Sequence, residues 1–234
     1  GGALELSHLV YEVANLANAC KVFRELTGVR PVLGGRHEAL GLQNAIVGLG
    51  GGRYLEFLAR TPVRSRQQRS NVGGVPVTVL GAECDRPRLL TWCCDASRVG
   101  LSSLVAELAQ LPQKHLFPVE IALMTGITRE GRRITWREAA DRHRSGWQNS
   151  LPMGGLVPLL RDWPSEQTLR PGLLAPAGCE LIELKAEHPE PQALTAALRS
   201  MRAGHLISVS GIEQGKEPRL MAVIRHAYGQ LVLE

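Results

Sequence analysis

The feature that most constrains the fold of this 234-residue chain is a pattern of one strand, one helix and further strands that occurs three times. Each run spans about 60 to 80 residues, which is typical of a supersecondary unit used repeatedly. We therefore expect an α+β protein built from three units, residues 1–80, 84–163 and 177–234. Residues 164–176 carry three prolines and are predicted to be a linker.

The first run has the clearest local signals. Residues 4–13 are apolar and rich in strand formers, so they predict a strand. A helix is predicted next from apolar residues spaced by three and four, and it ends at Gly28, a residue suited to a left-handed cap. Further strands are predicted over residues 29–33, 42–49 and 53–59. The order is β-α-β-β-β.

The same signals recur twice. The second run predicts a helix over residues 101–108 and strands over residues 88–95, 118–128, 133–137 and 156–161. Glu130-Gly131 marks a hairpin between the two middle strands. The third, shorter run is of β-α-β type, with a helix over residues 192–201 and strands over residues 179–185, 206–209, 220–225 and 230–233. The polar stretch 60–75 is predicted to be a loop.

Several classes of protein are excluded by composition. No stretch approaches the roughly 18 consecutive apolar residues that a spanning helix needs, so no membrane partner is expected. The arginines of residues 129–144 alternate with acids and lack an interleaved aromatic platform, so no nucleic acid is expected. The chain shows no signal peptide, and its five cysteines form no CxxC pair, which favours a cytoplasmic protein with reduced thiols.

The basic residues are unusual because only four of the 27 are lysine. Arginine favours planar, bidentate recognition of carboxylates and phosphates, so an anionic ligand is one interpretation. A genome that prefers arginine codons is the other.

Short motifs in the first two runs resemble a known family. In the first run they are SHLVY (7–11), LTGVRP (26–31), GRH (35–37), LQNA (42–45) and GRYLE (52–56). In the second run they are GRRITWR (131–137) and VPLLRDW (157–163). In this order and spacing they resemble the glyoxalase-like domain family of the vicinal-oxygen-chelate superfamily, most strongly over residues 4–59. The resemblance implies paired βαβββ modules that half-wrap a cleft, here followed by the shorter third unit.

The resemblance also implies a metal site. In metal-dependent members one ligand comes from the first strand of a module and another from the fourth, which here are His8 and Glu56. An imidazole and a carboxylate, completed by solvent, suit a divalent metal: Zn, Ni, Mn, Fe or Co. Glu56 is also the implied catalytic residue, because a ligating carboxylate can act as a base.

The second module departs from this pattern. Alignment of its strands with those of the first places Trp92 and either Leu159 or Leu160 at the remaining ligand positions, and none of these binds a metal. The metal site is then half complete unless His37, Cys93 or His143 supplies a further ligand. The predicted substrate-binding residues are His37, Asn44, Trp92, Trp136 and Arg137. Trp136 and Arg137 can offer stacking and an anion clamp, or can simply belong to a half-solvated hairpin strand. His37 and Asn44 can orient a ligand, or can be a turn histidine and a strand-end amide.

Two functions are compatible with these residues. The first is an enzyme, a lyase, isomerase or dioxygenase that converts a small oxygenated or carbonyl compound in the cleft between modules. The second is a non-catalytic protein of the same fold that binds or sequesters such a compound, which the apolar residues at Trp92 and Leu159 or Leu160 favour. In both cases the partner is a small molecule, and the resemblance implies a homodimer.

Overall fold

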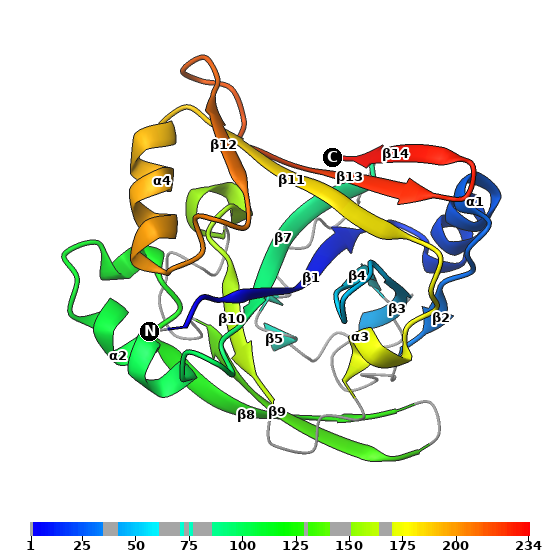
Figure 1. The fold of residues 1–234 in the computed structure, drawn as a ribbon, viewed down its shortest axis with the longest axis horizontal. Coiled ribbons are helices and arrows are strands. Elements are labelled where there is room, and N and C mark those ends of the chain that lie inside the picture. Colours follow the sequence, from blue (N-terminus) through cyan, green and yellow to red (C-terminus); the bar gives the residue numbers. More distant parts are fainter. Residues whose placement is uncertain are drawn as a thin grey trace.

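An eight-stranded sheet that curls into a half-barrel carries the first two units of the chain (Figure 1). The computed structural model describes residues 2–34, 42–60, 71–72, 75–76, 86–128, 131–140, 151–163 and 170–234. The strand order of the large sheet is β2-β3-β4-β1-β7-β10-β9-β8. Its two halves each come from one unit, and they meet where β1 pairs antiparallel with β7.

The first half has the predicted order of elements. They are β1 (Glu5–Glu12), α1 (Leu16–Thr27), β2 (Val32–Leu33), β3 (Leu42–Gly48) and β4 (Tyr54–Arg60). Asn15 begins the helix by accepting a hydrogen bond from the backbone N–H of Asn18. Gly28 ends it with a φ of 79°, as predicted, and its N–H bonds to the carbonyl of Arg24. The chain then returns so that β4 runs parallel to β1.

The second half repeats this arrangement. Its elements are β7 (Arg88–Asp95), α2 (Leu101–Ala109), the 3₁₀ helix η3 (Lys114–Leu116), β8 (Glu120–Ile127), β9 (Arg133–Ala140), the 3₁₀ helix η5 (Pro152–Gly155) and β10 (Leu159–Asp162). Strands β8 and β9 form the predicted hairpin. Because β10 runs parallel to β7 as β4 does to β1, the two halves are paired βαβββ modules, as expected.

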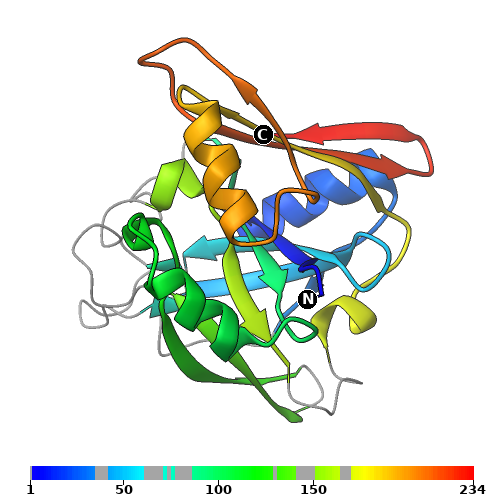
Figure 2. The same ribbon diagram turned by 60° about the vertical axis from the view of Figure 1, so that its left-hand side comes forward.

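The third unit forms a separate four-stranded sheet that lies over the large one (Figures 1 and 2). It consists of β11 (Glu180–His188), α4 (Pro191–Ser200), β12 (Ser208–Gly211), β13 (Arg219–His226) and β14 (Gly229–Leu233), in the order β12-β11-β13-β14. Here the strands on either side of the helix, β11 and β12, pair directly and in parallel. The third unit is thus of β-α-β type, and its pairing differs from that of the two modules.

The segment predicted to be a linker contains a short helix, α3 (Pro171–Leu174), in the part that the structure describes. Its Gly172 comes so close to the first module that an added Cβ would collide with the carbonyl oxygen of Gly52. Only glycine permits this approach. At the end of the predicted loop, β5 (Asn71–Val72) and β6 (Val75–Pro76) pair as a short hairpin.

The alternation of side chains along the strands gives the large sheet two different faces. On β4, Leu55 and Phe57 belong to the main core, together with residues of α1, α2 and the third unit. The residues that alternate with them, Tyr54 and Glu56, point to the opposite face. We call this opposite face of the large sheet the site face. No helix among the described residues has both the length and the apolar character needed to cross a membrane.

Candidate functional site

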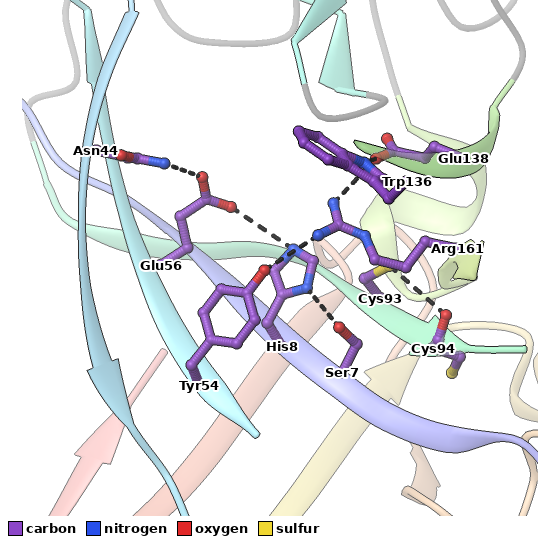
Figure 3. Close-up of polar contacts among 10 residues, drawn as sticks. All are labelled: Ser7, His8, Asn44, Tyr54, Glu56, Cys93, Cys94, Trp136, Glu138 and Arg161. Atoms are coloured by element: carbon purple, nitrogen blue, oxygen red, sulfur yellow. Dashed lines mark hydrogen bonds and ion pairs between the residues drawn. The ribbon is translucent and has the colours of Figure 1, made fainter. Parts of the chain in front are cut away.

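A row of paired residues crosses the middle of the site face. His8 on β1 pairs with Tyr54 on β4 at one side and with Cys93 on β7 at the other, and Cys93 pairs with Leu159 on β10. Directly paired residues share a face of a sheet. The first and last strands of both modules therefore bring their side chains together at this row (Figure 3).

The first module contributes a carboxylate held by two polar neighbours. Nε2 of His8 lies 3.6 Å from Oε2 of Glu56, and Asn44 on β3 donates a hydrogen bond of 2.8 Å to the other carboxylate oxygen. Oγ of Ser7 lies 3.1 Å from Nδ1 of His8. The side chain of His8 is 1 % exposed and that of Glu56 is 18 % exposed, so the carboxylate is the more accessible group of the pair.

His8 carries no charge at neutral pH. Burial lowers the pKa of its imidazole well below the usual range, and the positive charge of Arg161 lowers it further. The ring is stacked on that of Tyr54, with centroids 4.6 Å apart and planes inclined by 7°. A neutral imidazole adds no positive charge beside Glu56.

The second module contributes a buried cation. Arg161 on β10 donates a hydrogen bond of 3.0 Å to the hydroxyl of Tyr54 and one of 2.9 Å to Glu138 on β9. Trp136 donates to the same oxygen of Glu138 at 2.9 Å, and the guanidinium lies over its ring at 5.6 Å. The side chains of Arg161 and Glu138 are 5 % and 0 % exposed. Such a pair needs these additional contacts to offset desolvation.

Three buried polar atoms of this cluster have no hydrogen-bond partner among the described residues. They are Oδ1 of Asn44, Oε1 of Glu138 and Nε of Arg161. Buried polar atoms are nearly always bonded in folded proteins, so unpaired ones call for an explanation such as a bound ligand. Their location on three different strands marks this region as the candidate site.

Cys93 and Tyr54 keep their protons. Burial raises the pKa of the Cys93 thiol to about 12, against the opposing effect of Arg161. Burial likewise raises the pKa of Tyr54 above its usual range, although Arg161 again acts in the opposite direction. At neutral pH the row therefore holds a thiol and a phenol.

Strand register places different residues at the site than the alignment of the two modules suggested. Trp92 is fully buried on the other face, where its indole donates a hydrogen bond of 2.9 Å to the carbonyl of Leu156. Cys93 takes its place beside His8. Arg161 follows the paired Leu159 by two residues, just as Glu56 follows the paired Tyr54. The second-module counterpart of Glu56 is thus a cation.

The structure brings some of the predicted site residues together and not others. Asn44 and Trp136 lie on the site face with His8 and Glu56 (Figure 3). Arg137 points to the opposite face, where it forms an ion pair with Asp162 and a hydrogen bond to Ser102 of α2. His37 lies outside the described residues.

Three residues of the cluster were absent from the sequence-based set: Tyr54, Glu138 and Arg161. Strand alternation was the available signal for the first two, since Tyr54 precedes Glu56 by two residues and Glu138 follows Trp136 by two. Arg161 lies within the motif at residues 157–163, next to the leucines that were considered instead.

The donor set of the described residues does not fit a divalent metal. In the part of the chain that the structure describes, no group of three or more His, Cys, Asp or Glu side chains converges on one point. His8 and Glu56 provide two donors, and the second module adds a protonated thiol and a guanidinium. The guanidinium would repel a divalent cation rather than bind it.

The fold and the composition of this site define the class of protein. Two βαβββ modules that build one curled sheet, with side chains of their first and last strands converging, are the vicinal-oxygen-chelate fold. The glyoxalase-like domain family matches residues 6–201, and the chain belongs to this family. No protein with curated annotation matches the chain at a significant level.

Solved structures match the chain at low sequence identity, and the first of them shares its fold. A hypothetical protein from Staphylococcus aureus has a TM-score of 0.64 and 12 % identity, over 96 % of this chain and 92 % of that one. Methylmalonyl-CoA epimerase from Mycobacterium tuberculosis has a TM-score of 0.36 and 15 % identity, over 69 % and 86 %. A variant of the Streptomyces coelicolor methylmalonyl-CoA epimerase, in complex with 2-nitronate-propionyl-CoA, has a TM-score of 0.36 and 14 % identity, over 70 % and 97 %.

Proposed function

We propose that the site face binds a small oxygenated or carbonyl compound and that Glu56 acts on it as a general base. The observation that carries this proposal is the set of unpaired buried atoms on Asn44, Glu138 and Arg161. A ligand with both donor and acceptor groups would satisfy them. The cluster also contains opposite charges, Glu56 from one module and Arg161 from the other, which suits a polar rather than a hydrocarbon ligand.

Glu56 is suited to proton transfer. Asn44 fixes one carboxylate oxygen, while the other faces His8, which is neutral and adds no positive charge beside it. The described groups support acid–base chemistry, which is the chemistry of a lyase or an isomerase.

The test is an exchange experiment on the whole chain. The protein is incubated in D₂O with a panel of small ketones, α-hydroxyketones, aldehydes and 2-oxo acids, and proton NMR follows each compound. We expect loss of a C–H signal from at least one compound, and a loss of rate of about a hundredfold or more in Glu56→Gln. Glu183→Gln is the control, because Glu183 is half-exposed on the separate sheet.

The alternative function, binding without turnover, gives a different result. A compound that stabilises the protein against heat but is recovered unchanged would support sequestration and contradict the role of Glu56 as a base. The homodimer implied by the family stays a prediction, which light scattering of the purified chain would check.

A further inference from the structure

We infer that Tyr54, held by Arg161, donates the hydrogen bond that stabilises negative charge on the carbonyl oxygen of the substrate. The inference rests on the proposed function and narrows it to carbonyl compounds with an ionisable C–H bond next to the carbonyl group. A tyrosine–arginine pair would then do what a metal ion does elsewhere, which is to stabilise an oxyanion.

The hydrogen-bond directions at Tyr54 favour this role. Its oxygen accepts from Arg161 at 3.0 Å, and a guanidinium can only donate, so the phenolic proton is left for another acceptor. A phenol has one proton to donate, and Arg161 does not use it. A phenol that receives a charge-assisted hydrogen bond is in turn a stronger donor.

Arg161 is fixed in position from its other side. Glu138 accepts from it at 2.9 Å, and Trp136 and Trp163 lie against the guanidinium at 5.6 Å and 5.8 Å from its central carbon. These contacts come from β9 and from the residue after β10. A donor held in this way needs no reorganisation when charge develops on a ligand, which is the condition for effective oxyanion stabilisation.

Base and donor both contact the same imidazole. Tyr54 and Glu56 are two residues apart on β4 and share the site face, and the ring of His8 contacts both of them (Figure 3). A compound that places its C–H bond at Glu56 can place its carbonyl oxygen toward Tyr54. The oxyanion formed there is stabilised by Tyr54 and by the guanidinium of Arg161 that holds it.

The step conserves atoms and electrons. The carboxylate of Glu56 takes the proton of the C–H bond, and the electron pair of that bond forms a carbon–carbon double bond. The carbonyl π electrons move to oxygen, which becomes an enolate that accepts the hydrogen bond of Tyr54. Return of the proton from the carboxylic acid of Glu56 to carbon restores a carbonyl compound, with no oxidant or co-reactant required.

The first measurement uses p-nitrophenol as an oxyanion probe, because its ionised form absorbs visible light. Glu56→Gln is the appropriate background, since an amide resembles the protonated base and removes the repulsion between Glu56 and the probe. We expect this variant to bind p-nitrophenolate about tenfold or more tightly than the unchanged chain does.

Tyr54→Phe in the same background is the decisive variant. Loss of one hydrogen bond to a charged oxygen should weaken binding of the probe about ten- to a hundredfold. Tyr228→Phe is the matched control, because Tyr228 is exposed on the separate sheet, and it should leave affinity unchanged. Thermal unfolding of each variant identifies any loss of fold. Arg161→Lys provides a second test of the tyrosine–arginine pair, because lysine keeps the positive charge but not the planar geometry of the guanidinium.

The outcomes separate this inference from the proposed function. If Glu56→Gln stops C–H exchange but Tyr54→Phe alone leaves the rate unchanged, the inference is overturned and the base remains. If no compound exchanges, the proposed conversion fails, and the probe still decides the role of Tyr54. Equal affinity of folded Tyr54→Phe and its background, or no binding of the probe to either, would overturn the inference.

Discussion

The two βαβββ modules share one pairing scheme but present opposite charges on the site face. The first presents Glu56, a partly exposed carboxylate that Asn44 holds. The second presents Arg161, whose buried guanidinium forms an ion pair with Glu138 and lies over the ring of Trp136. In both modules the same strand positions face the site. The residue at each of these positions, and not the fold, determines whether the site favours a metal ion or an oxyanion.

The largest expected effect concerns the buried ion pair of the second module. Arg161→Met should lower the free energy of unfolding by about 3–5 kcal/mol, because it leaves the buried carboxyl group of Glu138 without its cation. Replacing both residues, as Arg161→Met with Glu138→Met, should recover most of this loss. Denaturant unfolding measures both variants. If Arg161→Met alone were as stable as the unchanged chain, the ion pair of Arg161 and Glu138 would not be buried as described.

The next effect separates the two faces of β7. Trp92→Phe should cost about 1–3 kcal/mol, because it removes a buried hydrogen bond and leaves the carbonyl of Leu156 unpaired. Binding of p-nitrophenolate in the Glu56→Gln background should not change. A loss of affinity without a loss of stability would instead place Trp92 among the ligand-binding residues.

The thiol of Cys93 predicts a pH dependence of stability. Its pKa is raised to about 12 in the folded chain, whereas an unfolded cysteine ionises near pH 8.5. The unfolded state therefore releases its proton first, and stability falls as the pH rises above about 8.5. Between pH 8 and pH 10 the unchanged chain should lose about 1–2 kcal/mol more than Cys93→Ala does. Equal losses would mean that the folded thiol ionises normally.

The smallest expected effect is that of divalent metals. Because the second module places the guanidinium of Arg161 on the site face with His8 and Glu56, added Zn²⁺ or Mn²⁺ should leave the melting temperature unchanged. A preferential ligand of the folded state would raise it. Differential scanning fluorimetry before and after chelator treatment checks this, with His8→Ala as the comparison. A rise in melting temperature that His8→Ala abolishes would restore the metal site that the family resemblance implied.

Local sequence signals predicted the secondary structure closely where they were strong. Strand β7 has the predicted bounds, and α1 ends at Gly28 because glycine adopts the left-handed conformation without strain. The signal was weaker at β2, which covers only two residues of the five predicted. The family resemblance identified His8, Glu56 and Asn44, but their roles in binding and catalysis stay predictions.

The site residues of the second module could not be predicted from local sequence signals. The register of β1 against β7 shifts between Leu6 and His8 and again between Val10 and Tyr11. The motif alignment of the two modules was off by one residue, and a shift of one residue moves side chains to the other face of a sheet, so it selected Trp92 where the structure has Cys93. The contact of Arg161 with Tyr54 joins residues 107 positions apart, which no local pattern reports.

The sequence by itself determined the order of strands and helices, because periodicity, helix caps and turn residues act within a few positions of the chain. It also contained the recurring strand–helix–strand pattern and the short motifs that resemble the glyoxalase-like family, to which the chain belongs. The strand pairing of the third unit became clear only in the tertiary structure. There β11 pairs with β12, the next strand in the chain, whereas β1 of the first module pairs with β4, the last strand of that module. Only the tertiary structure, too, set a buried arginine opposite the carboxylate, because register and burial depend on contacts between strands that are distant in sequence.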